Sequence, residues 1–175
     1  MTQKTQSYSQ TTDTPALVLE GGGFRGMFTS GVLDVLMERG LTGFSSVWGV
    51  SAGAMNAVSF KSGQIGRTMR IMLAYRDDKR FMSYLSFAKT GDLAGGEFVY
   101  ETVQEELDPC DNDAFEENPM PMFAVVSNVT FGTSDYLRIR KLPEDAVKVR
   151  ASASLPGVSR TLLIDGQRYL DGGTT

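Results

Sequence analysis

The sequence predicts an α/β fold with a mainly parallel central sheet, because two strand–turn–helix units follow one another along the chain. The first unit starts with the apolar run 16–20, passes through a glycine-rich turn and enters a helical pattern at 28–39. The second starts with the strand pattern 46–50 and enters a helix at 54–61 after a turn of small residues. Strands that alternate with helices pair in parallel, since each helix carries the chain back to the same end of the sheet.

Helical spacing of apolar residues predicts two further helices, at 65–76 and 97–107. Another helix is expected over 143–153, because proline suits the first turn of a helix. The stretch 108–121 is acidic and holds three prolines, which predicts a loop. The aromatic stretch 81–87 fits core packing best, while a lid or a lipid-facing patch is the alternative.

The last third of the chain predicts strands. Apolar runs at 122–126 and 136–141 indicate two strands on either side of a turn. Residues 162–164 and 168–170 flank the pair Asp165 and Gly166, which is typical of a tight β-hairpin turn.

The composition predicts one domain. A chain of 175 residues with 41% hydrophobic content can bury a single core, which we assign to residues 16–175. Residues 1–15 are rich in Ser, Thr and Gln and lack the apolar block of a signal peptide, which predicts a disordered tail. Cys110 has no second cysteine to pair with, so we expect a cytoplasmic protein, with peripheral contact to a membrane left open.

Charge and residue counts narrow the classes of function. A formal net charge of -4 gives no electrostatic basis for a nucleic-acid partner. The absence of histidine from the sequence excludes a Ser-His-Asp triad and histidine metal sites within this chain. Any hydrolytic mechanism must therefore use another base.

Ser51 is the candidate nucleophile. It lies between Gly49 and Gly53 in a G-x-S-x-G pattern, at the end of a predicted strand and the start of a predicted helix. This is the arrangement of a nucleophile elbow, in which a sharp turn exposes the serine hydroxyl and leaves no room for side chains two residues before and after it.

The first glycine-rich turn joins the first strand to its helix and contains Gly21, Gly22, Gly23, Arg25 and Gly26. Its spacing also fits the dinucleotide fingerprint, but that fold requires an acidic residue at the end of the second strand, where none stands. The same N–H groups could instead form an oxyanion hole, which stabilises the negative oxygen formed when a serine attacks an ester. This interpretation explains both turns, while a non-hydrolytic nucleotide- or phosphate-binding module is the alternative.

Two aspartates compete for the role of the base. Asp171 follows an apolar pair and precedes Gly172 and Gly173, whereas Asp165 belongs to the predicted hairpin turn. We therefore expect Asp171 to accept the serine proton. A free aspartate, with a pKa of about 3.9, is a weak base at neutral pH, so the site is expected to be partly desolvated.

These motifs resemble those of the patatin-like phospholipases and occur in the same order. Residues 21–26 look like the oxyanion segment G-G-G-x-R-G, residues 49–53 like the nucleophile motif, and residues 171–173 like the D-G-G/A motif. Residues 153–156 are similar to a fourth motif, an Ala-Ser pair followed by Pro. The resemblance covers about residues 17–173 and is greatest to bacterial members of unassigned substrate.

The resemblance implies a three-layer α/β/α domain that hydrolyses lipid or small esters through a dyad of Ser51 and Asp171, without a metal or a cofactor. It also implies that the chain is an incomplete, N-terminal part of the domain, because family members continue beyond the D-G-G motif whereas this chain ends at Thr175. A family member inactivated by truncation is therefore a further alternative to an active lipid acyl hydrolase.

Overall fold

The computed structural model describes residues 14–81, 91–92, 96 and 98–175. Most of the predicted tail and all but the first residue of the aromatic stretch lie outside the described residues. In chain order the elements are β1 (Leu17–Leu19), η1 (Gly23–Arg25), α1 (Gly26–Glu38), β2 (Val47–Val50), α2 (Ala52–Lys61), α3 (Arg67–Tyr75), η2 (Phe98–Leu107), α5 (Asn112–Glu117), β3 (Met122–Asn128), β4 (Thr133–Ile139), α6 (Ala146–Ser152), β5 (Leu162–Ile164), β6 (Gln167–Asp171) and η3 (Gly172–Thr174).

The strands form one mixed sheet in the order β1-β2-β3-β6-β5, with β4 also paired to β3. The α/β class is confirmed, and the predicted parallel pairing holds for β1, β2 and β3. The pairs β3–β4, β3–β6 and β5–β6 are antiparallel instead. Their connections explain part of this difference, because β3 and β4, like β5 and β6, are joined by turns too short for a parallel crossover.

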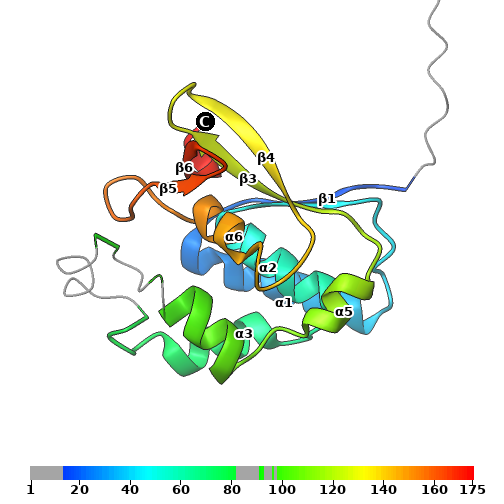
Figure 1. The fold of residues 1–175 in the computed structure, drawn as a ribbon. Coiled ribbons are helices and arrows are strands. Elements are labelled where there is room, and N and C mark those ends of the chain that lie inside the picture. Colours follow the sequence, from blue (N-terminus) through cyan, green and yellow to red (C-terminus); the bar gives the residue numbers. More distant parts are fainter. Residues whose placement is uncertain (1–13, 82–90, 93–95, 97) are drawn as a thin grey trace, which may run out of the picture.

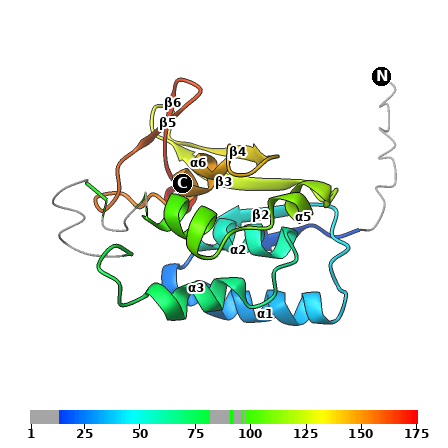
Figure 2. The same cartoon turned by 60° about the horizontal axis from the view of Figure 1, so that its bottom comes forward.

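The described α-helices pack on one face of this sheet (Figure 1). Helix α2 lies against β1, β2 and β3, and α6 lies against β3 and β6. Helices α1 and α3 form an outer row that covers α2, as Figure 2 shows. The sheet and these helices supply two layers of the expected three-layer arrangement. The core between them includes Leu19, Leu33, Val47, Ala54, Phe60, Met122, Ile139 and Val149.

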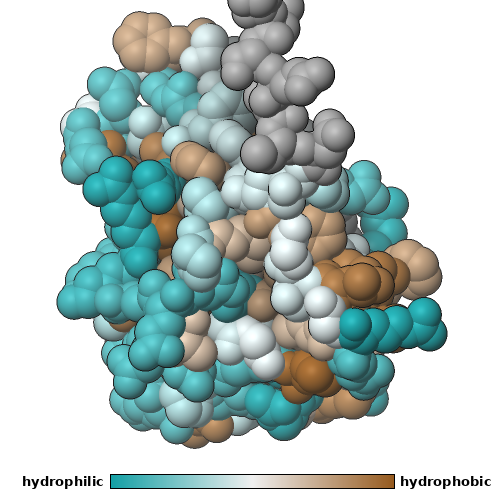
Figure 3. Space-filling model, turned by 90° about the vertical axis from the view of Figure 1, so that its right-hand side faces the viewer, coloured by the Kyte–Doolittle hydropathy of each residue, from teal (hydrophilic) through white to brown (hydrophobic). Residues whose placement is uncertain are grey.

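The opposite face of the sheet also carries apolar side chains. The strand register aligns Val18, Trp48 and Phe123 across three strands. The Trp48 ring stacks on Phe123 with 4.1 Å between centroids, and Tyr136 meets Trp48 edge-on at 5.5 Å. Val18 is 71% exposed. Figure 3 shows the end of the molecule where β1 begins, with brown apolar residues gathered beside a teal hydrophilic surface. Apolar side chains on both faces are typical of sheets with parallel strands.

One loop prediction is wrong, and one predicted helix differs from an α-helix in its hydrogen-bond pattern. The stretch predicted as a loop contains α5, because the Asp111 side chain accepts a hydrogen bond from Ala114 N at 2.9 Å and so caps the first turn. The predicted helix 97–107 is a π-helix, η2, and Asp108 N bonds to Val103 O five residues earlier. None of the described helices has the length and apolar character needed to cross a membrane.

Two strand ends meet at the middle of β3. Strand β2 runs parallel to β3 and pairs Val50 with Val125, whereas β6 runs antiparallel and pairs Asp171 with Val126. Because β4 occupies the other edge of β3, the two strands approach one edge from opposite ends. Their C-terminal ends therefore stand head to head. This topology brings Ser51, which follows Val50, beside Asp171.

Candidate active site

Ser51 stands in a strained turn between β2 and α2. Its φ of 55° lies in the left-handed region, which residues other than glycine rarely adopt. Space explains the glycines on either side: a Cβ at Gly49 would overlap Ala54 Cα, and a Cβ at Gly53 would overlap Leu19 O. The turn has the geometry of the predicted nucleophile elbow.

We expect Gly53→Ala to destabilise the fold by about 1–3 kcal/mol or more, because the added methyl group must displace the backbone of β1. Gly31→Ala is the matched control, since a Cβ there meets no heavy atom within 4 Å. In the middle of α1 this control should be neutral or stabilise by up to about 1 kcal/mol. Thermal unfolding of both variants makes the comparison. Equal midpoints for Gly53→Ala and wild type would contradict this close packing.

The first glycine-rich turn lies against the elbow. A Cβ at Gly21 would be 2.9 Å from Ser51 Cβ, and a Cβ at Gly26 would be 3.0 Å from Ala52 Cβ. Asn56 of α2 connects the two segments, because its Nδ2 donates a hydrogen bond to Gly26 O at 2.9 Å. Two motifs that the sequence presents separately therefore form one site.

The N–H groups of this turn are available as donors. Those of Gly22 and Gly23 form no hydrogen bond with the described part of the chain. Gly23 has a φ of 55°, a conformation that favours glycine. The Arg25 side chain folds back over the turn, since a Cβ at Gly22 would lie 3.3 Å from Arg25 Nε. The positive charge of Arg25 therefore lies beside these donors.

The structure separates the two candidate bases. Asp171 is 2% exposed at the end of β6, and its Oδ1 accepts a hydrogen bond from Gly173 N at 2.8 Å. Asp165 is exposed in the turn between β5 and β6, where it has a φ of 48° and Gly166 has a φ of 77°. The hairpin prediction for Asp165 is confirmed.

Asp171 has one unpaired oxygen. Its buried Oδ2 has no hydrogen-bond partner within the described ranges, and Oδ1 accepts only the bond from Gly173 N there, so Ser51 Oγ and Asp171 are not directly hydrogen-bonded in this ligand-free structure. Leaving a buried acceptor unpaired costs about 1–3 kcal/mol of folding free energy, so a folded protein keeps such an atom where it has a function. Catalytic hydrogen bonds are often long without a ligand and shorten when substrate binds.

Sequence reasoning misses Ser152 and Asn56. The Ser152 hydroxyl accepts a hydrogen bond from Ser51 N at 2.9 Å, whereas the sequence draws attention to the neighbouring residues 153–156. Two Ala-Ser pairs follow each other here, and nothing in the sequence says which hydroxyl reaches the elbow. Asn56 is placed only once the angle between α2 and the glycine-rich turn is known.

Ser51 opens on an apolar pocket with a cavity volume of about 180 Å³. Helices α1, α2, α3 and η2 all contribute to its wall, and Phe24 and Leu155 are lining residues that are about half exposed. The pocket therefore suits an apolar ligand with one end at Ser51. Its apolar lining includes Phe24, Met27, Met55, Met72, Phe81 and Val99.

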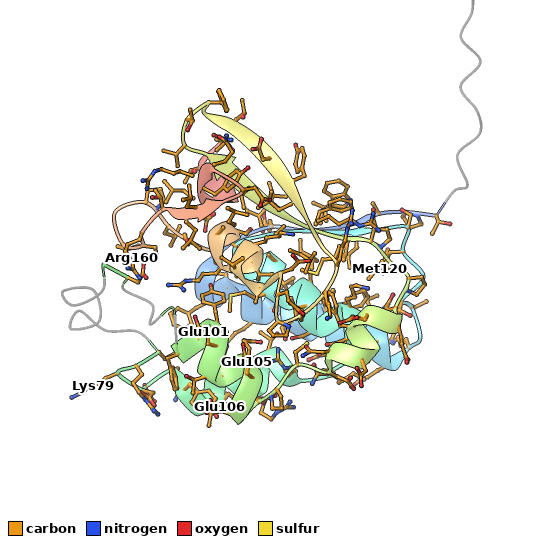
Figure 4. The ribbon with its side chains drawn as sticks, viewed as in Figure 1. Lys79, Glu101, Glu105, Glu106, Met120 and Arg160 are labelled. Carbon is orange, nitrogen blue, oxygen red and sulfur yellow. The ribbon has the colours of Figure 1, made fainter. Side chains whose placement is uncertain are left out.

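An ion-pair cluster joins the loop before β5 to α6. Asp92 is buried and pairs with Arg150 and Arg160, each at 3.1 Å. Burial by itself would raise the pKa of Asp92, but hydrogen bonds from Arg160 and the charges of both arginines outweigh it and lower the pKa. Glu101 of η2 lies 4.0 Å from Arg150, and Figure 4 shows Glu101 and Arg160 on the same side of the molecule.

Tyr100 contributes a phenol to the pocket wall. Burial raises the pKa of Tyr100; the charge of Arg150 opposes this shift, and those of Asp171 and Asp92 add to it. The phenol therefore stays protonated at neutral pH. Its hydroxyl contacts Met55 Sδ at 3.7 Å, which is a weak acceptor.

A model of the patatin-like phospholipase family matches residues 17–175. That range contains Ser51, Asp171 and both glycine-rich turns. The chain belongs to the patatin-like phospholipase family. The resemblance inferred from the sequence motifs is thereby confirmed.

Patatin-like relatives of this chain are mostly uncharacterised. The uncharacterised protein YjjU of Escherichia coli is 31% identical over 163 residues, which cover 90% of this chain and 45% of YjjU. The uncharacterised NTE family protein Rv1063c of Mycobacterium tuberculosis is 30% identical over 169 residues, which cover 90% of this chain and 42% of that protein. Lysophospholipase NTE1 of Mycosarcoma maydis is 27% identical over 164 residues, covering 90% of this chain and 8% of NTE1. The chain spans less than half the length of these curated relatives.

Among solved structures, VipD from Legionella pneumophila is similar in fold, with a TM-score of 0.51 and 16% sequence identity. The match covers 93% of this chain and 46% of the VipD chain. At this level of identity the similarity concerns the fold alone. It supports the patatin-like α/β arrangement described above.

Proposed function

We propose that the protein is a serine lipid acyl hydrolase, of the phospholipase A or esterase type, that uses Ser51 and Asp171. The observation that carries this proposal is the head-to-head meeting of β2 and β6. It brings a strained serine, which opens on an apolar pocket, beside a buried carboxylate whose Oδ2 has no partner in the described part of the chain. A serine hydroxyl becomes a nucleophile when a base lies within reach of its proton.

The proposed reaction has two halves. In the first, Asp171 takes the hydroxyl proton of Ser51 while Ser51 Oγ attacks the ester carbonyl carbon. The bond to the leaving alcohol then breaks, Asp171 gives its proton to that alcohol, and an acyl-enzyme remains. In the second half, Asp171 takes a proton from water as the water oxygen attacks the acyl group. Release of the fatty acid returns the proton to Ser51 Oγ.

In this mechanism, the first glycine-rich turn stabilises the oxyanion. The N–H groups of Gly22 and Gly23, which have no partner among the residues that the structure describes, are its donors, and Arg25 supplies a positive charge nearby. Gly21 and Gly26 allow the turn to approach the elbow closely, because a Cβ at Gly21 would lie 2.9 Å from Ser51 Cβ and one at Gly26 would lie 3.0 Å from Ala52 Cβ. Donors fixed before the reaction stabilise the developing charge without reorganisation, which makes them effective.

Of the two backbone N–H groups at the elbow, one is a further proposed donor to the oxyanion and the other is not. Ser51 N already donates to Ser152 Oγ, so it does not serve the oxyanion. The Ala52 N–H lies in the first turn of α2 and has no partner within the described residues. This N–H group lies at the N-terminus of α2, where the positive end of the helix dipole stabilises a negatively charged oxygen. Ala52 is therefore a proposed donor that the sequence analysis did not name.

We expect Gly23→Ala to lower kcat by about 100-fold, because an alanine disfavours the φ of 55° and turns the N–H away from the oxyanion. Gly43→Ala is the control, since a Cβ there meets no heavy atom within 4 Å and its φ is not in the left-handed region. Steady-state hydrolysis of a p-nitrophenyl ester measures both. Turnover of Gly23→Ala within about twofold of wild type would remove this turn from the oxyanion hole.

The apolar pocket supports a lipid acyl chain as the substrate group. Burying methylene groups there is favourable by about 0.8 kcal/mol each. The relative from Mycosarcoma maydis is named a lysophospholipase, which is consistent with this class of substrate. Phe24 and Leu155, half exposed in the pocket wall, are apolar groups that could touch a lipid surface. Peripheral contact with a membrane is thus part of the proposal.

A panel of substrates tests the proposed function. It comprises p-nitrophenyl esters from butyrate to palmitate, lysophosphatidylcholine and diacyl phosphatidylcholine, together with p-nitrophenyl phosphate and a binding titration with ATP. We expect cleavage of carboxylic esters, faster with longer acyl chains, and neither phosphate cleavage nor ATP binding. Binding of ATP without ester cleavage would favour the nucleotide-binding module, and inactivity in every arm would favour the inactive family member.

A further inference from the structure

The Ser152 hydroxyl lies between the elbow and the sheet. Ser152 ends α6 and its surface is fully buried, at 0% exposed. Its Oγ accepts a hydrogen bond from Ser51 N at 2.9 Å and donates one to Val125 O at 2.6 Å. A single hydroxyl thus joins β2 to β3 at the point where the chain turns into α2.

This hydroxyl occupies the place of a missing ladder bond. In the parallel pairing of β2 with β3, Val47 N donates to Pro121 O at 2.8 Å. The donor advances by two residues at each step, so the regular ladder would place Ser51 N on Val125 O. Ser152 Oγ stands between these two atoms and bonds to both. The Ser152 hydroxyl therefore separates the backbone of the elbow from β3, where a regular ladder would join them directly.

The C-terminal end of β6 lies beside the gap that Ser152 keeps between the elbow and β3. A Cβ at Gly172 would overlap Val125 O, so the residue after Asp171 lies directly on the carbonyl that Ser152 also contacts. The segment just after α6 also contacts β6, because Asp171 N donates a hydrogen bond to Ser154 O at 2.8 Å. One short segment therefore contacts the backbone of both proposed catalytic residues.

We propose that Ser152 is a positioning residue, which holds the Ser51 backbone at the distance from β3 that lets Ser51 Oγ reach Asp171. The inference rests on the proposed function and deepens it. Ser152 acts through the Ser51 N–H and does not touch the substrate. Misplacing a reacting group by about 1 Å can cost about 100-fold in rate, and removal of this hydroxyl would allow such a shift.

Ser152→Ala tests the proposal by its effect on turnover. We expect kcat to fall by about 10- to 100-fold with KM nearly unchanged, because the pocket that binds the acyl chain is untouched. Ser62→Ala is the matched control: Ser62 is also buried just after the end of α2, and its hydroxyl donates a hydrogen bond to Val58 O of that helix at 3.0 Å. The control should lose a similar amount of thermal stability while keeping kcat. An unchanged kcat in Ser152→Ala would overturn the proposal.

Hydrogen exchange at the Ser51 amide gives a readout that does not depend on activity. We expect this amide to exchange at least about 10-fold faster in Ser152→Ala than in wild type or Ser62→Ala, because its acceptor is gone. Equal protection in all three proteins would overturn the positioning role. If wild type cleaves no ester, the proposed function fails, yet the exchange rates still decide whether Ser152 holds the elbow. If Ser152→Ala does not fold, Ser152→Cys takes its place in both experiments. The expected changes in kcat and in exchange rate are then smaller, because a thiol keeps a weak donor and a weak acceptor at this position.

Discussion

Ser51→Ala is expected to lower the kcat for ester hydrolysis by about 10⁴- to 10⁶-fold, the scale on which other serine hydrolases respond to loss of the nucleophile. The fold should persist, since alanine and serine meet the same strain at a φ of 55° and the change removes one oxygen. Titration of released fatty acid measures the rate, and thermal unfolding measures the fold.

Ser45→Ala provides the control for this prediction. Ser45 is an exposed serine before β2, and its backbone N bonds to Pro15 O whatever the side chain. Its replacement should leave both rate and stability as in wild type. Hydrolysis by Ser51→Ala at a tenth of the wild-type rate or more would assign the nucleophile to another residue.

Asp171→Asn is expected to lower kcat by about 10²- to 10⁴-fold, because the amide keeps the shape of the side chain and removes its basicity. The asparagine Oδ1 can still accept the hydrogen bond from Gly173 N, so the end of β6 should stay in place. KM should change little, since Asp171 is not among the residues that line the pocket. Steady-state kinetics with one p-nitrophenyl ester separate kcat from KM.

Asp165→Asn is the matched variant for the base. Asparagine tolerates the φ of 48° at this position, and Asn-Gly forms the same hairpin turn. Activity and stability should therefore stay at their wild-type values. A loss of turnover in Asp165→Asn, with Asp171→Asn fully active, would reverse the assignment of the two aspartates.

Much of the fold could be predicted because its signals are local. Apolar runs that end in glycine give β1 and β2, and the Asp165-Gly166 pair gives the β5–β6 hairpin. Helix α5 is not predicted, because the acidic and proline-rich composition of residues 108–121 is typical of a loop. The hydrogen bond by which Asp111 caps this helix is not evident from that composition. The π-helix η2 has no composition of its own, so the sequence indicates a helix and not its hydrogen-bond pattern.

The candidate site also contains residues that local patterns predict and residues that they do not. Gly49, Gly53 and Ser51 are readable, because a sharp elbow needs these residue types at this spacing. The contribution of Ser152 depends on a hydrogen bond between residues 101 positions apart, which no local pattern encodes. The approach of β2 and β6 to one edge of β3 is likewise a property of the whole sheet.

Covalent labelling with a fluorophosphonate tests the central claim most directly, because only an activated serine displaces fluoride from the reagent. Mass spectrometry of the intact protein and of its peptides should show one adduct per wild-type chain, on Ser51, and much slower labelling of Asp171→Asn. An adduct on another residue, or equal labelling rates for wild type and Asp171→Asn, would contradict a nucleophile activated by Asp171.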